Sequence, residues 1–167
     1  MDEVSQLQKD IRQRINKLRH LGVSEDVIEN ILASGRTLGR LLITADYRLL
    51  LPDNGNAEII LTPLQRTIYL LFLKYSDGIR FKDLFSYKEE LYSIYLSICK
   101  RENLCGMTDS ICGIINPMSN RINENCSRIK RAVLNVLDPP IAEYYFITGT
   151  KSELKRILLD RSLVKYE

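Results

Sequence analysis

The sequence lacks the residue groupings that metal and redox sites use. Its four cysteines, Cys99, Cys105, Cys112 and Cys126, form no CxxC pair, and His20 is the only histidine. Structural zinc sites take cysteine and histidine ligands in closely spaced pairs, so these residues do not predict one. We expect no metal and no cofactor, and we expect the cysteines to be buried, reduced thiols that pack as small hydrophobic side chains.

Long hydrophobic segments and a strong charge of one sign are also missing. The longest aliphatic and aromatic run, Ile68–Leu73, is far shorter than the roughly 20 residues that cross a bilayer. The first residues, MDEVSQLQKD, are acidic and polar, unlike a secretory signal peptide. We therefore expect a cytoplasmic protein with no membrane partner. The net charge of +3 does not by itself indicate a nucleic-acid partner.

Motifs of enzyme active sites are absent as well. The segment Gly149–Ser152 has some likeness to a phosphate-binding loop, but Tyr144 occupies the position of the required first glycine and Thr150 separates the Gly-Lys pair. Glu89 and Glu90 are adjacent acids, and neighbouring residues on a helix point about 100° apart, so these carboxylates do not converge. We predict that the protein is not an enzyme.

Residues 1–38 predict a helical hairpin. The first helix, over residues 2–20, has one apolar stripe, made of Val4, Leu7, Ile11, Ile15 and Leu18. Gly22 follows it, as glycine often does just past a helix. Ser24 then predicts the start of a second helix, whose apolar face is Val27, Ile28, Ile31 and Leu32 and which we expect to end at Gly35. This hairpin either packs on the rest of the chain or, through residues 1–35, pairs with a second copy or another protein.

Residues 39–167 predict a second domain that begins with a small sheet. Three short aliphatic segments, 40–44, 47–51 and 57–61, are separated by turn residues that include Asn54-Gly55, a strong hairpin signal. Thr62-Pro63-Leu64-Gln65 then combines an N-cap, a first-turn proline and a capping-box glutamine, which predicts a central helix. A short extended link at 79–81 leads to a second helix over 82–100. Residues 101–116 predict an irregular insertion with one short helix at 108–115.

The C-terminal third predicts a helix followed by a hairpin. Within residues 119–137 an apolar stripe of Ile122, Cys126, Ile129 and Val133 lies opposite a polar face rich in Arg, Lys and Asn. After the break at residues 138–140, Tyr144–Thr148 predicts a strand. Residues 153–159 fit both a helix and a strand. We favour a strand, because the preceding one needs a partner and the turn at 149–152 has the length of a hairpin turn.

This order of elements resembles the winged helix-turn-helix effector domain of OmpR/PhoB-type response regulators. The residues that carry the resemblance are Leu61-Thr62-Pro63-Leu64-Gln65, the helix up to Gly78, and Ile79–Leu84. The resemblance implies an α+β fold, with a small N-terminal antiparallel sheet, a recognition helix at 119–137 and a wing formed by the C-terminal β-hairpin. Residues 1–35 do not resemble the acidic phosphoacceptor pocket of a receiver domain, and the segment at 82–116 is longer than in that family.

The predicted function is duplex DNA binding by a bacterial transcriptional regulator. Cations are needed at the phosphates, and arginine and asparagine commonly read base edges in the major groove. The predicted DNA-binding residues are Asn120, Arg121, Asn123, Ser127, Arg128, Lys130, Arg131, Lys151 and Lys155, with Asn125 as a further base-reading side chain.

The alternative function is a protein-protein interaction module on the same scaffold, without nucleic acid. The small net charge, the insertion at 101–116 and the extra helical hairpin favour it. A continuous positive face along 119–131 and 149–156 would favour DNA. Interruption of that face by Glu124 and Glu153, together with an exposed apolar patch elsewhere, would favour a protein partner.

Overall fold

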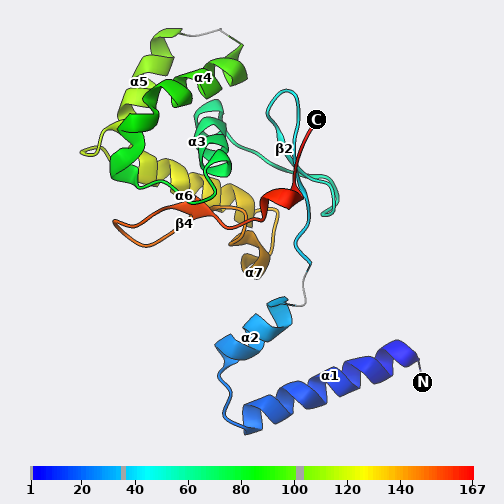
Figure 1. Cartoon of the computed structure of the whole chain (residues 1–167). Coiled ribbons are helices and arrows are strands. Elements are labelled where there is room, and N and C mark those ends of the chain that lie inside the picture. Colours follow the sequence, from blue (N-terminus) through cyan, green and yellow to red (C-terminus); the bar gives the residue numbers. More distant parts are fainter. Residues whose placement is uncertain (1, 35–36, 101–103) are drawn as a thin grey trace. The chain divides into compact units, whose positions relative to one another are not determined.

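The computed structural model describes residues 2–34, 37–100 and 104–167, and it divides into two compact units, Met1–Thr37 and Leu38–Glu167 (Figure 1). The first unit holds helices α1 (Glu3–His20) and α2 (Glu25–Ser34). The turn between them uses Gly22 at φ +80°, a conformation that glycine adopts without strain. The predicted end of the second helix at Gly35 lies outside the described residues.

A small mixed sheet opens the second unit. Strands β1 (Leu41–Ile43), β2 (Leu49–Leu51) and β3 (Ala57–Ile59) pair antiparallel, as predicted, and Gly55 and Asn56 take the positive φ angles of a tight hairpin turn. The prediction of a purely antiparallel sheet is wrong. The C-terminal strand β6 (Val164–Tyr166) pairs parallel with β1, which gives the strand order β3-β2-β1-β6. Nothing in the few residues of β6 shows which strand they would pair with.

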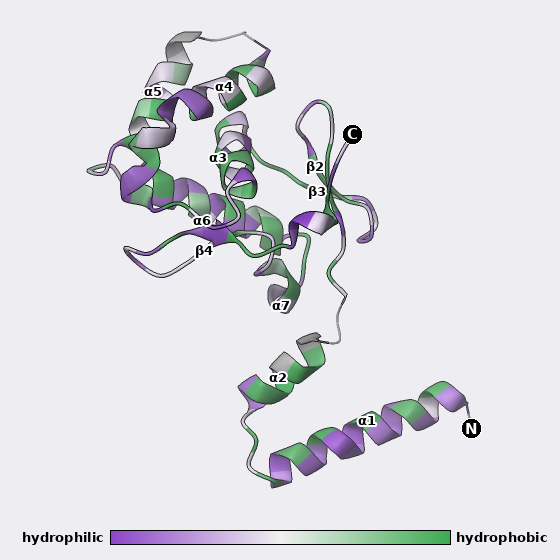
Figure 2. Cartoon of the chain, viewed as in Figure 1, coloured by the Kyte–Doolittle hydropathy of each residue, from purple (hydrophilic) through white to green (hydrophobic). Residues whose placement is uncertain are grey.

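The central helix α3 (Pro63–Lys74) begins where the capping signal predicted. The Thr62 hydroxyl accepts from the Gln65 backbone N–H at 3.4 Å, and the Gln65 side chain accepts from the Thr62 N–H at 3.1 Å. The helix is buried along most of its length, and Figure 2 shows both apolar and polar residues along it. The Tyr69 hydroxyl is fully buried and donates to the Tyr145 carbonyl at 2.7 Å, which ties α3 to the C-terminal third of the chain.

Two predictions between α3 and Asn116 need correction. The helix expected over 82–100 begins as a 3-10 helix, η1 (Phe81–Tyr87), and becomes the α-helix α4 at Lys88–Cys99. The expected irregular insertion at 101–116 is instead mostly α5 (Leu104–Ile115), which packs against α4 and α6. The short helix predicted at 108–115 is therefore part of a longer one, in which Met107, Ile111 and Ile114 are spaced by four and three and are all buried.

The C-terminal third contains α6 (Arg121–Leu134), the short α7 (Pro139–Ala142) and a hairpin of β4 (Ile147–Thr148) and β5 (Arg156–Ile157). The hairpin is confirmed, although both strands are shorter than predicted. A bridge between Ile79 and Lys155 extends this sheet. The link after α3 therefore pairs with the hairpin segment at β5, and β5 pairs with β4. A 3-10 helix, η2 (Arg161–Leu163), leads into β6. The α+β class is therefore confirmed.

One side chain near the C-terminus connects these layers. The Arg161 guanidinium donates to the carbonyls of Leu73 at 2.7 Å and Phe72 at 3.3 Å, at the C-terminal end of α3, and also to those of Ile157 and Leu159. Carbonyls in the last turn of a helix have no partner within the helix, so a cation there satisfies them and also interacts favourably with the helix dipole. Arg161 thus joins α3 to the end of the hairpin.

Candidate functional site

Helix α6 presents the predicted polar face, with one correction. Its apolar side chains Ile122, Ile129 and Val133 are buried against the core. Asn125 is also buried, at 8% exposure, and its amide donates to the Arg121 carbonyl at 2.9 Å. Asn125 therefore belongs to the buried side of the helix and is not available to read base edges.

The two flanks of α6 are partly committed to contacts within the protein. On one flank Arg121 lies over α5, where its guanidinium donates to the Asp109 carbonyl at 3.4 Å and fills the space beside Gly113. On the other flank the Lys130 ammonium lies 5.1 Å from the centre of the Phe146 ring. The outer ridge between these flanks carries Asn120, Ser127, Arg128 and Arg131, which are all exposed, together with Glu124.

The link after α3 forms a further part of this surface. Ile79 exchanges backbone hydrogen bonds with Lys155 at 2.9 and 3.0 Å. The approach is close at Gly78, which has φ +95° and where an added Cβ would lie 2.7 Å from the Lys155 carbonyl oxygen. In this extended link Ile79 and Phe81 pack inward while Arg80 and Lys82 are exposed. These two cations are not among the predicted DNA-binding residues. Their alternation with Ile79 and Phe81 indicates that they are exposed, but not that they lie beside the hairpin.

The hairpin turn faces this link. Its chain reversal uses Gly149 at φ +146° and Ser152 at φ +67°, and the Thr150 hydroxyl donates to the Glu153 carboxylate. The Lys155 ammonium lies 5.5 Å from the centre of the Phe81 ring and donates to the Gly149 carbonyl. These contacts stabilise the turn. Lys155 keeps further N–H donors beyond this one bond.

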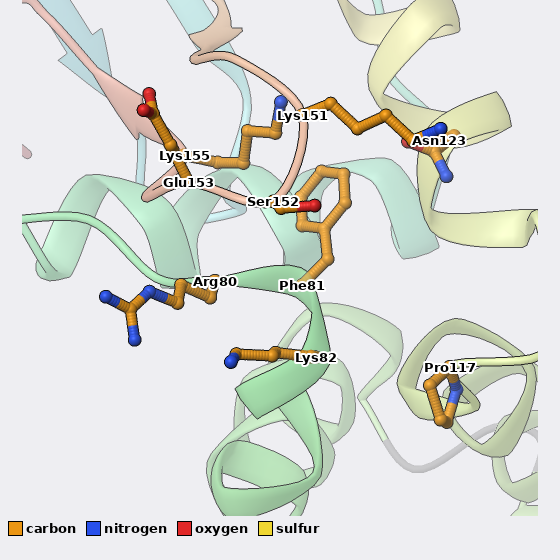
Figure 3. A pocket seen from close by; sticks show the side chains of 9 residues that line it. All are labelled: Arg80, Phe81, Lys82, Pro117, Asn123, Lys151, Ser152, Glu153 and Lys155. Atoms are coloured by element: carbon orange, nitrogen blue, oxygen red, sulfur yellow. The ribbon is translucent and has the colours of Figure 1, made fainter.

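Together these segments line a pocket of about 570 Å³, which we call the basic groove (Figure 3). Figure 3 shows Phe81 pointing toward the hairpin turn at Ser152, while Arg80 and Lys82 extend to one side of the link. The groove is lined by Arg80, Phe81, Lys82, Pro117, Asn123, Lys151, Ser152, Glu153 and Lys155. Four of these side chains are cations and one is an acid.

A neighbouring hollow continues the groove around the hairpin. It measures about 500 Å³ and shares Arg80, Ser152 and Glu153 with the basic groove, and it adds the exposed cation Arg156. Five cations therefore lie on the hairpin or on the link beside it. Across residues 2–34, 37–100 and 104–167, ion pairs connect other residues, such as Arg40 with Asp53 and Arg48 with Glu58, but none involves these five.

Three of the nine predicted DNA-binding residues meet at the groove. Asn123 comes from α6, and Lys151 and Lys155 come from the hairpin. The other six, Asn120, Arg121, Ser127, Arg128, Lys130 and Arg131, lie on α6 outside the groove lining. Asn120 accepts from the Asn123 amide at 3.1 Å, so these two side chains form one polar patch at the start of the helix.

The cysteines show one difference from expectation. Cys112 is exposed, whereas Cys126 is largely buried in the core, and this burial raises the pKa of its thiol to about 12. The side chain of Cys105 lies outside the described part of the chain. No group of three or more His, Cys, Asp or Glu side chains in the described residues is arranged to hold a metal ion. Within the same residues, every helix is too short or too polar to span a membrane.

Comparison with known protein families, characterised proteins and solved structures gave no match for this chain.

Proposed function

We propose that this protein binds duplex DNA through the basic groove and the outer ridge of α6. The observation that carries the proposal is the convergence of Arg80, Lys82, Lys151 and Lys155 on one open pocket beside an exposed polar helix. DNA affinity comes largely from cations that displace counterions from phosphates. The backbone pairing of the link with the hairpin suits that task, because it brings the four cations to one pocket before the ligand arrives.

The arrangement of elements supports a winged-helix reading of this surface. The sheet runs from the link at Ile79 to β5 and then to β4, and it lies beside α3 and α6. In this proposal α6 is the recognition helix and the hairpin is the wing. An α-helix fits the major groove of B-form DNA, where Asn and Arg side chains can form paired hydrogen bonds with base edges.

Roles can be assigned to individual side chains within the proposal. Arg80, Lys82, Lys151 and Lys155 contact phosphates next to the groove. Asn120, Asn123, Ser127, Arg128 and Arg131 face the bases or the phosphates of the major groove. Arg121 and Lys130 contribute mainly by supporting α6, because each already contacts α5 or Phe146. The protein would then be a DNA-binding regulator rather than an enzyme.

A protein-interaction module is the second candidate, and specific residues favour it. Glu124 lies among the cations on the outer ridge of α6, and Glu153 lines the basic groove, so neither surface is uninterrupted in charge. Met118 and Phe85 are 92% and 67% exposed, and exposed large apolar side chains are typical of protein contacts. For this candidate, the groove would receive acidic side chains of a partner.

Fluorescence anisotropy with a random-sequence duplex across a salt series tests the proposal. Contact with four or more phosphates gives a slope of log K against log salt steeper than about −3, at about −0.9 for each phosphate. The double variant Arg80→Ala/Lys82→Ala should weaken binding and make the slope shallower by about 2. The charge-matched control Lys9→Ala/Lys165→Ala removes two exposed cations outside the groove and should leave the slope unchanged.

Circular dichroism and thermal melting of each variant show that the fold is retained. Absence of binding by the folded wild-type protein at low salt would contradict DNA binding and favour the second candidate. Equal weakening by the groove variant and by its control would show instead that the contact is made elsewhere.

A further inference from the structure

Helix α1 leaves its apolar stripe largely uncovered within the N-terminal unit. None of its residues is buried, and Val4, Leu7 and Ile11 are 56%, 55% and 51% exposed. Ile15 and Leu18, farther along the same stripe, are half-buried because α2 packs beside them. Figure 2 shows the alternation of apolar and polar residues along this helix. A short helix is marginally stable unless tertiary contacts cover such a face.

The spacing of the stripe is symmetric about Ile11. Successive members are three, four, four and three residues apart, which averages to the 3.5-residue repeat of a coiled coil. When a second copy of α1 runs antiparallel with a two-fold axis at Ile11, Val4 meets Leu18 of the second copy and Leu7 meets Ile15. A two-fold interface needs this kind of self-complementary surface, in which each residue and its partner exchange places.

The charges beside the stripe are complementary in the same antiparallel arrangement. Glu3, Asp10, Arg14 and Lys17 lie along one flank of the helix, with the acids in its first half and the cations in its second. The two-fold axis brings Glu3 near Lys17 of the second copy and Asp10 near Arg14. A parallel pair would instead place this flank against the opposite flank of the second copy, which α2 already occupies.

The other flank of α1 is already occupied by α2. Arg19 pairs there with Glu25 at 2.7 Å, and Arg12 lines a pocket between the helices together with Glu29. The cations of that flank therefore have acidic neighbours from α2. The stripe from Val4 to Ile11 and the flank with Glu3 and Asp10 remain the uncovered part of the unit.

We propose that α1 pairs antiparallel with α1 of a second copy of this chain and forms a symmetric dimer centred on Ile11. The interface consists of the apolar stripe at the centre and the complementary charges along one edge. The interface and the basic groove use different parts of the chain, because the described lining of the groove comes from the unit Leu38–Glu167.

Light scattering across a concentration series, with charge-reversal variants of the full chain, tests the pairing. The wild type should dimerise. Arg14→Asp and Asp10→Arg should each weaken the dimer by about tenfold, because each places like charges together at both symmetric positions. The double variant Asp10→Arg/Arg14→Asp should recover most of the wild-type affinity. The control Lys9→Asp makes the same change of charge as Arg14→Asp, but on the outer face of α1. It should leave the affinity of the dimer unchanged.

Disulfide cross-linking determines the direction of the helices. In a Cys112→Ser background, mixed Val4→Cys and Leu18→Cys chains should cross-link to each other, and neither should cross-link alone, because a disulfide needs Cα atoms within about 7 Å. A parallel pair would give the opposite result and overturn the proposal.

Two further results would also overturn it, namely a wild-type monomer at every concentration and a double variant that stays as weak as the single variants. Failure of DNA binding would leave these outcomes unaffected, so the two proposals can be separated.

Discussion

The two units of this chain bury their apolar residues to very different extents. The unit Leu38–Glu167 has a continuous core in which Leu41, Tyr69 and Phe72 are fully buried. In Met1–Thr37, Ile28 is the one buried side chain among those described. Helices with a similar spacing of apolar residues therefore form a closed core in one unit and leave an uncovered stripe in the other. The amphipathic pattern alone does not say what covers the apolar face.

The comparison predicts a large difference in the energetic cost of core truncation. Phe72→Ala removes a fully buried ring that packs edge-on against Phe81, and it should lower the free energy of unfolding by about 3–5 kcal/mol. Leu7→Ala removes a half-exposed side chain and should cost less than about 1 kcal/mol for the monomer, measured by urea denaturation at low protein concentration. Similar losses in both variants would contradict the difference between the units.

Arginine side chains in the two units provide a second comparison. Arg161→Met should lower the free energy of unfolding by about 2–3 kcal/mol, because four backbone carbonyls lose a charged donor. Arg19→Met breaks an exposed pair with Glu25 and should give no measurable change in the denaturation midpoint. A stable Arg161→Met variant would show that the link between α3 and the hairpin is dispensable.

Two glycines with positive φ angles separate backbone strain from steric contact. At Gly78 an alanine Cβ would meet the Lys155 carbonyl, so Gly78→Ala should destabilise the protein by about 2–3 kcal/mol. At Gly22 an alanine has no neighbour within 4 Å, so Gly22→Ala should show only the cost of the backbone conformation, about 1 kcal/mol. Thermal melting measures both effects. Equal effects would mean that the close approach of the link to β5 has no energetic importance.

The smallest predicted effect concerns the pH dependence of Glu90. Burial opposes ionisation of this carboxyl, but hydrogen bonds from Lys74 and Tyr75 hold its pKa below the ordinary value of 4.5. A lowered pKa in the folded state adds stability above pH 4.5, and this stability is lost as the pH falls through the lowered value. Glu90→Gln should therefore cost up to about 1 kcal/mol at pH 7 and less in acid. A loss that is independent of pH would point to packing instead.

Local signals in the sequence predicted most elements of the fold. The capping residues at Thr62 and Gln65, the Asn54-Gly55 turn and the stripe of α6 each act over a few residues, so their structures follow from the sequence nearby. The pairing of β6 with β1 joins residues more than a hundred positions apart, and no local pattern specifies it. Helix α5 was predicted only in part, over 108–115, because glycine and threonine obscure the spacing of its buried apolar residues.

The sequence predicted the residues of the candidate site only where they lie within a single helix or hairpin. The polar face of α6 and the lysines of the hairpin were visible in the sequence. Arg80 and Lys82 could be recognised as part of the surface only once Ile79 was paired with Lys155, because that bridge brings the link beside the hairpin. Asn125 was assigned to the wrong face because the buried side of α6 is wider than its apolar stripe.

An NMR titration of the uniformly labelled protein with duplex DNA tests the proposed interface most directly. The proposal predicts that the largest amide shift changes fall on Arg80, Lys82, Lys151 and the start of α6 at Asn123, while amides of α1 and α2 remain in place. Shift changes confined to the N-terminal unit, or none at all at low salt, would contradict it.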